Sequence, residues 1–135
     1  MKRLLLILLC LPLLFTTCKK EDEEPTNNSS PSIIGAWTIN TLILESNTSS
    51  ETLFPEDIGF ATTLDFRTGG ILYEHRSNGI DTNEWAILGD SLYIGEDGEH
   101  FRSKHEVTNT NLTLRGPIDE NMWFATTMTI NATRD

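Results

Sequence analysis

The two cysteines are the residues of this chain with the most distinctive chemistry. Cys10 lies in an apolar run, and Cys18 stands where that run gives way to charged residues, in the sequence LLFTTCKKEDEE. If the apolar run is cleaved off, Cys10 leaves with it and Cys18 has no disulfide partner. An unpaired, exposed cysteine is a liability in an exported protein. Cys18 is therefore predicted either to be covalently modified or to remain a free thiol.

Histidines and acidic residues form the second group with binding chemistry. His75 and His105 are expected on inward faces, beside Tyr73 and Val107, where two imidazoles could contribute to a metal site. The sequence supplies no third ligand at a recognisable spacing, so surface or hydrogen-bonded core histidines are the alternative. Residues 96–100, EDGEH, lack the alternating oxygen ligands of a calcium loop. We therefore expect no metal site and interpret this segment as an acidic hairpin tip.

Enzymatic motifs are missing from the sequence. It contains no Gly-x-Ser-x-Gly elbow, no phosphate-binding loop and no zinc-protease histidine pair. Scattered Ser, His and Asp residues do not by themselves define a catalytic triad. The sequence therefore predicts a protein that is not an enzyme and needs no cofactor.

Net charge excludes one class of partner. Asp and Glu total 20 against 10 Lys and Arg, which gives a formal net charge of −10 at pH 7. The resulting negative field repels phosphate backbones, so nucleic acid is not an expected partner. The same field argues against electrostatic adhesion to anionic membranes. A chain of 135 residues has room for one folded domain and short accessory segments.

Residues 1–17 have the three-part layout of a secretory signal. They begin with Lys2 and Arg3, continue through an apolar stretch at residues 4–15, and end in threonines directly before the second cysteine. The stretch is about a dozen residues long, whereas a spanning helix needs roughly 20. Pro12 would also interrupt a helix. This segment is therefore predicted to be a cleaved signal peptide and not a transmembrane anchor.

The junction FTTC, residues 15–18, resembles the lipidation box of bacterial lipoprotein precursors. Phe15 and Thr17 depart from the stricter pattern, which has Leu first and a small residue before the cysteine, and resemble the looser boxes of one gram-negative group. The resemblance implies that acyl chains such as palmitate are attached to Cys18 and hold the protein on a membrane. Three chains, usual in this family, make a stable anchor. The alternative is a free thiol after conventional signal cleavage.

Residues 18–31 are predicted to form the lipidated cysteine and a flexible acidic tether. After Cys18 the sequence KKEDEEPTNNSSP has a run of acids, then turn-forming residues, and no apolar residue to bury. An acidic run at this place also resembles the signal that moves some lipoproteins of that group to the outer face of the outer membrane. A plain solvated linker is the alternative. The predicted location is the outer membrane, on its periplasmic face or on the cell surface.

Residues 32–135 are predicted to form one all-β domain. Apolar and β-branched residues alternate there in short runs separated by turn signals. Turns such as Gly89 and Asp90 predict sequential hairpins, and closing the meander removes two exposed edges. This indicates an antiparallel up-and-down barrel of about eight strands. The expected strands are residues 33–45, 60–66, 71–76, 84–88, 91–95, 101–108, 111–115 and 122–130.

Alternation within these runs predicts which side chains face inward, because side chains in a strand repeat every two residues. Arg102, Lys104 and Glu106 mark a wet face opposite Phe101 and Val107. One buried and one wet face per strand favours antiparallel pairing. The other inward positions are expected to be Phe60, Thr62, Leu64, Phe66, Trp85, Ile87, Leu92, Ile94, Leu112, Leu114, Met122, Phe124, Met128 and Ile130.

Four short motifs in this domain point to a known family. They are GAW at residues 35–37, WAILGDSLYI at residues 85–94, LTLR at residues 112–115 and TMTI at residues 127–130. Together they resemble the lipocalin-like domain of small bacterial lipoproteins. The resemblance implies a lipocalin-like barrel in which Gly35 and Trp37 form a structural motif at one end. It also implies an arginine packed across the Trp37 ring, for which Arg115 and Arg134 are both candidates.

The same resemblance implies a binding module for a small apolar or amphipathic molecule. Strands of about six residues favour an interior filled by side chains or left with a small cavity. The loop at residues 46–59 is expected to tuck Leu53 and Phe54 onto the barrel end; a partner-binding or ligand-gating tip is the alternative. The alternative function is a non-enzymatic structural or protein-interaction accessory of the outer membrane, with a filled barrel core.

Overall fold

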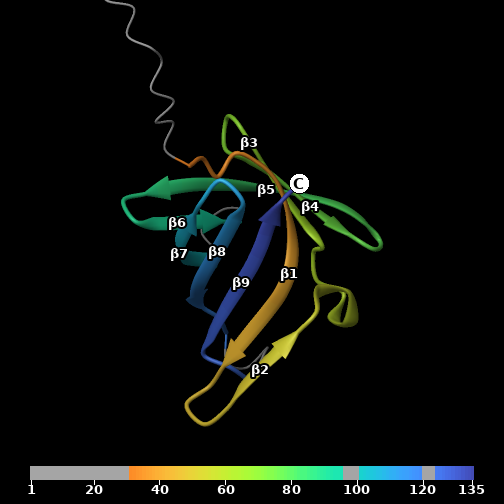
Figure 1. Ribbon diagram of the computed structural model, residues 1–135, viewed down its shortest axis with the longest axis vertical. Helices are drawn as coiled ribbons and strands as arrows, with labels where there is room; N and C mark the ends of the chain where they lie inside the picture. Colours follow the sequence, from red (N-terminus) through yellow and green to blue (C-terminus); the bar gives the residue numbers. More distant parts are fainter. Residues whose placement is uncertain (1–30, 96–100, 120–123) are drawn as a thin grey trace, which may run out of the picture.

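The computed structural model describes residues 31–95, 101–119 and 124–135 and consists almost entirely of β-strands (Figure 1). The predicted signal peptide, the lipid attachment at Cys18 and nearly all of the predicted tether lie outside the described residues, so they stay predictions. Among the residues described, no helix has the length and apolar character that crossing a membrane requires.

Nine strands in the described part of the chain form one antiparallel sheet. Consecutive strands from β3 to β9 are paired, and β1 pairs with β3 on one side and with β9 on the other. The β1–β9 pairing closes eight strands into an up-and-down barrel, while β2 extends the end of β1 outside the ring. The predicted fold class is therefore confirmed. The strands are β1 (Gly35–Glu45), β2 (Ser50–Leu53), β3 (Thr63–Arg67), β4 (Ile71–Arg76), β5 (Gly79–Leu88), β6 (Ser91–Ile94), β7 (Phe101–Val107), β8 (Asn111–Pro117) and β9 (Thr127–Arg134).

The turn between β5 and β6 shows why neighbours in sequence pair in space. Leu88 pairs with Ser91, so Gly89 and Asp90 form the predicted two-residue connection. Gly89 has a φ of 65°, a left-handed conformation that costs glycine little and that tight hairpin turns require. The chain therefore reverses within two residues and the next strand lies beside the previous one.

A β-bulge in β1 was not anticipated from the sequence. The register of β1 against β9 shifts between Ile39 and Thr41, so Asn40 is the extra residue that a bulge inserts. Trp37 and Ile39 are buried before the bulge, and Leu42 is buried after it. Without the shift, these side chains would face opposite sides of the sheet. The bulge therefore lets one long strand supply core residues along its whole length.

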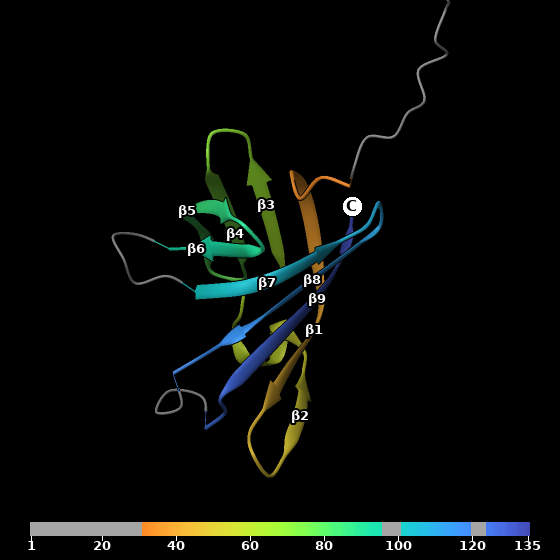
Figure 2. The same ribbon diagram turned by 90° about the vertical axis from the view of Figure 1, so that its left-hand side faces the viewer.

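One end of the barrel is filled by side chains. Trp37, Phe66, Leu72, Leu92 and Leu114 each have 0% of their surface exposed. The first described residues and the C-terminus lie at this end, whereas β2 lies at the opposite end, as the two perpendicular views show (Figures 1 and 2). We call the filled end the closed end and the other the open end. The sequence predicted an interior filled by side chains or left with a small cavity, and side chains fill the closed end.

The long loop between β1 and β3 differs from its prediction. Residues 46–59 contain strand β2 and the 3-10 helix η2 (Pro55–Ile58), which starts at a proline and ends at Gly59 in a left-handed conformation. Leu53 is half-buried and packs against the core, as expected, but Phe54 is 54% exposed. Pro55 is buried in its place. The prediction that Phe54 packs onto the barrel end is therefore wrong.

The last strand lies further along the chain than predicted. β9 runs from Thr127 to Arg134, because the apolar alternation of Met128 and Ile130 continues through Ala132, all three of which are buried. Phe124 is 90% exposed and has a φ of 55°. The inward placement of Phe124 is therefore wrong, and Met122 lies outside the described residues.

Strand β5 is longer than its apolar pattern indicated. It was expected over residues 84–88, but it has 10 residues because it begins at Gly79 within a polar stretch. β1 has 11 residues and begins at Gly35, so it is slightly shorter than the expected residues 33–45. The polar start of β5 pairs with β4, so Leu72 lies opposite Asn83 and Glu74 opposite Asp81. At its other end Ile87, expected inside, is 41% exposed. These extra residues lengthen the barrel wall at the open end.

Candidate ligand-binding site

The closed end is held together by Trp37 and an arginine. The indole Nε1 of Trp37 donates a hydrogen bond of 2.7 Å to the Ile33 carbonyl. The guanidinium carbon of Arg134 lies 4.3 Å from the centroid of the Trp37 ring, within the range of a cation–π contact. Arg134 also donates to the carbonyl oxygens of Ser32, at 2.5 Å, and Ile34, at 3.2 Å. The two chain ends are thereby joined over the buried tryptophan.

The two arginines that were candidates for packing on Trp37 lie at different positions in the barrel. Arg134 covers Trp37, whereas Arg115 lies on β8 and forms an ion pair of 2.8 Å with Glu45. Gly35 has a φ of 129°, and a Cβ on it would lie 3.2 Å from Arg134 Nη1. A side chain at position 35 would therefore strain the backbone and crowd the arginine. These contacts give Gly35, Trp37 and Arg134 a structural role at the closed end.

The open end contains a cavity of about 530 Å³. That volume lies within the range of small-molecule sites, about 300–1,000 Å³. Most of its wall is apolar, and its lining residues come from strands β3 to β9 and the segments next to them. The lining residues are Phe60, Leu64, Glu74, Arg76, Asn83, Ile94, Gly95, Phe101, Pro117, Ile118, Asp119, Met128 and Ile130. An apolar molecule could therefore remove its surface from water here.

A connected group of polar side chains lies on one side of this cavity. Glu74 accepts hydrogen bonds from Arg76 Nη2, at 2.7 Å, and from Asn83 Nδ2, at 3.0 Å. Arg76 Nε lies 2.8 Å from a carboxylate oxygen of Asp81. The Arg76 guanidinium also lies 5.7 Å from the centroid of the Phe60 ring. The cavity therefore joins an apolar wall to a fixed polar cluster, the combination typical of sites for amphipathic ligands.

Sequence reasoning missed this polar cluster because it placed the wrong face of β4 inside. Tyr73 and His75 were expected inward, but Leu72 is fully buried and Glu74 and Arg76 line the cavity. Since side chains alternate along a strand, Tyr73 and His75 lie on the outer face. The sequence did contain a signal for the correct inward face of β4. Leu72 is apolar and therefore expected inside, and Glu74 and Arg76 lie on the same face of the strand because side chains repeat every two residues.

The two histidines do not form a metal site. His75 is on the outer face of β4, whereas His105 shares the inward face of β7 with Phe101 and Ser103. Within residues 31–95, 101–119 and 124–135, no three His, Cys, Asp or Glu side chains are arranged to hold a metal ion. The predicted acidic hairpin tip, residues 96–100, lies outside the described residues.

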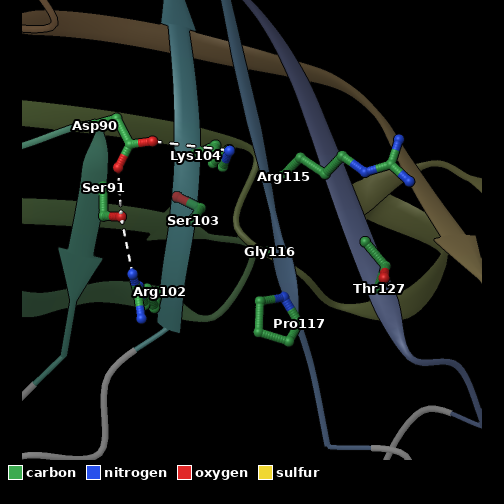
Figure 3. Close-up of a pocket in the computed structure, with 9 residues that line it drawn as sticks. All are labelled: Asp90, Ser91, Arg102, Ser103, Lys104, Arg115, Gly116, Pro117 and Thr127. Carbon is green, nitrogen blue, oxygen red and sulfur yellow. Dashed lines mark hydrogen bonds and ion pairs between the residues drawn. The ribbon is translucent and has the colours of Figure 1, made fainter.

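A second hollow, of about 580 Å³, lies on the outer wall across β6 to β9 (Figure 3). Arg102, Lys104 and Arg115 line it, and they are half of the Lys and Arg residues in the described part of the chain. Lys104 Nζ lies 3.8 Å from Asp90, and Arg115 points toward Glu45. We call this hollow the outer groove.

Arg102 is the least neutralised cation of the outer groove. It donates a hydrogen bond of 3.4 Å to the Ser91 hydroxyl and lies 5.7 Å from the centroid of the Tyr93 ring. Among the described residues, no carboxylate lies within ion-pair distance of it. The groove is therefore a locally basic area on an acidic protein.

Comparisons with known proteins add nothing to this geometry: no family model, no curated protein and no solved structure matches the chain.

Proposed function

We propose that the protein is a non-enzymatic binding module for a small amphipathic molecule, held at the open end of a lipocalin-like barrel. The single observation that supports this function is the cavity of about 530 Å³ inside that end. A barrel needed only as a spacer gains stability from filling its interior. An unfilled volume bordered by hydrogen-bonded polar groups is better explained by a ligand.

The lining favours an elongated ligand with two chemically different ends. Leu64, Ile94 and Ile130 provide buried apolar surface in the cavity lining. Burying apolar ligand area against such a wall contributes roughly 25 cal/mol per Å². The hydrogen-bonded cluster around Glu74 and Arg76 provides a place for a polar head. Both parts belong to rigid strands, so little ordering is needed on binding.

The proposal also includes attachment to the outer membrane through acyl chains on Cys18. The chain enters the barrel at the closed end, where Ile33 accepts the hydrogen bond of Trp37. The cavity lies away from this end, where β4 ends at Arg76 and β9 begins beside Met128. A tether joined to the closed end leaves the mouth of the cavity unobstructed, whichever face of the membrane carries the protein.

Binding is tested by titrating the purified protein with the neutral fluorescent probe N-phenyl-1-naphthylamine. We expect saturable binding that Ile94→Trp weakens at least about tenfold, because the larger side chain fills the cavity next to Gly95. Ile80→Trp is the matched control, since Ile80 is 60% exposed and lies outside the cavity lining. Absence of saturable binding, or equal binding by both variants, would contradict the proposed function.

A second candidate function is a protein-interaction accessory, and the outer groove is the observation that favours it. Arg102, which has no carboxylate partner among the described residues, suits an acidic segment of a partner protein. If this function holds, Arg102→Glu abolishes recovery of one defined partner in pull-downs from native membranes. Arg67→Glu is the control, because Arg67 is exposed but paired with Asp65 at 2.5 Å. Equal recovery with both variants would eliminate this candidate.

A further inference from the structure

We propose that the cavity selects amphiphiles with a cationic, amine-type head over those with a carboxylate head. This inference rests on the proposed ligand-binding function and adds the chemical class of the head group. It follows from the balance of charges in the polar cluster at the open end.

The cluster contains one cation shared between two acids. Arg76 contacts Glu74 through Nη2 at 2.7 Å and Asp81 through Nε at 2.8 Å. The strand register explains this sharing, since Glu74 on β4 and Asp81 on β5 lie directly opposite each other. Two like charges at a cross-strand pair repel each other, and the guanidinium of Arg76 offsets part of that repulsion. The three groups together carry a charge of minus one.

The remaining lining does not supply a compensating positive charge from the described residues. Apart from Glu74, Arg76 and Asp119, which has interactions of its own, the described lining residues are uncharged. The chain as a whole is also acidic, with a formal net charge of −10. A head group in the cavity therefore experiences a negative potential from both near and distant groups.

Burial makes this local charge effective. The side chain of Glu74 is 13% exposed and that of Arg76 is 27% exposed, so both are partly shielded from water and salt. Charges in such surroundings interact more strongly than charges in bulk water. An ammonium group can donate hydrogen bonds to carboxylate oxygens, whereas a second carboxylate would add to the repulsion.

A carboxylate head would have to compete for Arg76. Two of its nitrogens already contact acids, and Nη1 donates at 3.4 Å to the carbonyl of Gly59. Nε is buried and has no hydrogen-bond partner among the described residues, but it lies 2.8 Å from a carboxylate oxygen of Asp81. A ligand carboxylate at the guanidinium would therefore lie close to an acid that repels it. The geometry therefore disfavours fatty acids and favours aliphatic amines.

The test compares three ligands that share one tail: decylamine, 1-decanol and decanoic acid. Their dissociation constants for the purified protein are measured by displacement of N-phenyl-1-naphthylamine at neutral pH and low salt. Decylamine is expected to bind at least about tenfold more tightly than decanoic acid, the effect of one charge-assisted hydrogen bond, with 1-decanol in between. The difference should shrink as salt concentration rises, because salt screens the partly exposed charges.

Two variants link the preference to the cluster. Glu74→Gln keeps the shape of the side chain and removes one negative charge, so the ratio of amine to acid affinity should fall severalfold. Asp81→Asn should lower the ratio in the same direction, and because the Asp81 side chain is 62% exposed this variant retains the fold. Glu106→Gln, on the exposed face of β7, is the charge-matched control and should leave the ratio unchanged.

The outcomes separate this inference from the proposed function. Equal binding of the three ligands, or tighter binding of decanoic acid, would overturn the head-group inference and leave the binding module standing. Failure of all three ligands and of the probe would overturn the binding module itself. An equal fall of the affinity ratio in Glu106→Gln would show that net charge and not the cluster sets the preference, which also overturns the inference.

Discussion

At the scale of residues, the structure of the closed end depends on the contact between Arg134 and Trp37. Arg134 combines a cation–π contact to Trp37 with hydrogen bonds to two carbonyls of the incoming chain. Arg115, the other arginine the sequence left open, makes one ion pair on the surface with a side chain that is 59% exposed. Arg134 therefore has a structural role, whereas Arg115 contributes little to the free energy of unfolding.

This contrast predicts different stabilities for two alanine variants. Arg134→Ala should lower the free energy of unfolding by about 1–2 kcal/mol, because it removes the ring contact and leaves two carbonyls unpaired. Arg115→Ala should cost about 0–1 kcal/mol, as exposed ion pairs usually do. Denaturation by urea, followed by tryptophan fluorescence, measures both. Equal losses in the two variants would contradict the assignment of Arg134 as the residue that holds the closed end.

At the scale of elements, the close approach of β7 and β8 explains why Gly116 has no side chain. Gly116 lies near the end of β8, and a Cβ on it would come within 2.1 Å of the Arg102 carbonyl oxygen and 3.1 Å of the Ser103 Cα. Both contacts are with the backbone of β7 and neither can rotate away. The close approach of β7 and β8 beside the outer groove therefore requires glycine at this position.

Gly116→Ala should consequently destabilise the protein by about 1–3 kcal/mol, the range for overpacking in a tight site. Thr113→Ala is the control, because Thr113 is on the same strand, is half-buried and is expected to cost less than about 1 kcal/mol. Thermal unfolding monitored by circular dichroism compares the two. A Gly116→Ala variant as stable as the parent protein would show that β7 and β8 lie further apart than described.

At the scale of the whole molecule, the two ends of the barrel differ in structure. The closed end joins the first described residues to the C-terminal strand, and the open end contains the cavity. Attachment at the closed end suits a protein that is tethered to a surface and receives its ligand from the opposite side. The proposed acyl anchor on Cys18 belongs to this scale, because it would determine the location of the entire barrel.

The anchor predicts a specific chemical change in material from the native host. Mass spectrometry of the mature N-terminus should show acyl groups on Cys18 and no residues before it, and the protein should fractionate with membranes. Cys18→Ser should abolish acylation and release the protein from the membrane fraction. Cys10→Ser should leave both properties intact. An unmodified Cys18 still preceded by Thr17 would eliminate the lipoprotein proposal.

Much of the architecture was predictable from the sequence because it depends on local chemistry. Alternating apolar residues and the tight turn at Gly89 determine antiparallel neighbours, and Leu64, Leu92 and Leu114 are buried as expected. These features follow from side-chain period and backbone conformation, which neighbouring residues largely determine. The arginine over Trp37 was implied instead by the resemblance of the GAW motif to lipocalin-like domains, and Arg134 lies there.

Other features depend on contacts between segments that are distant in the sequence, and only the tertiary structure determined them. The choice of Arg134 over Arg115 required the β1–β9 pairing. The bulge at Asn40 and the inward face of β4 follow from the register imposed by neighbouring strands. So does the cavity beside Glu74 and Arg76, because an unfilled volume results from the packing of the whole barrel wall and no single stretch of sequence contains it.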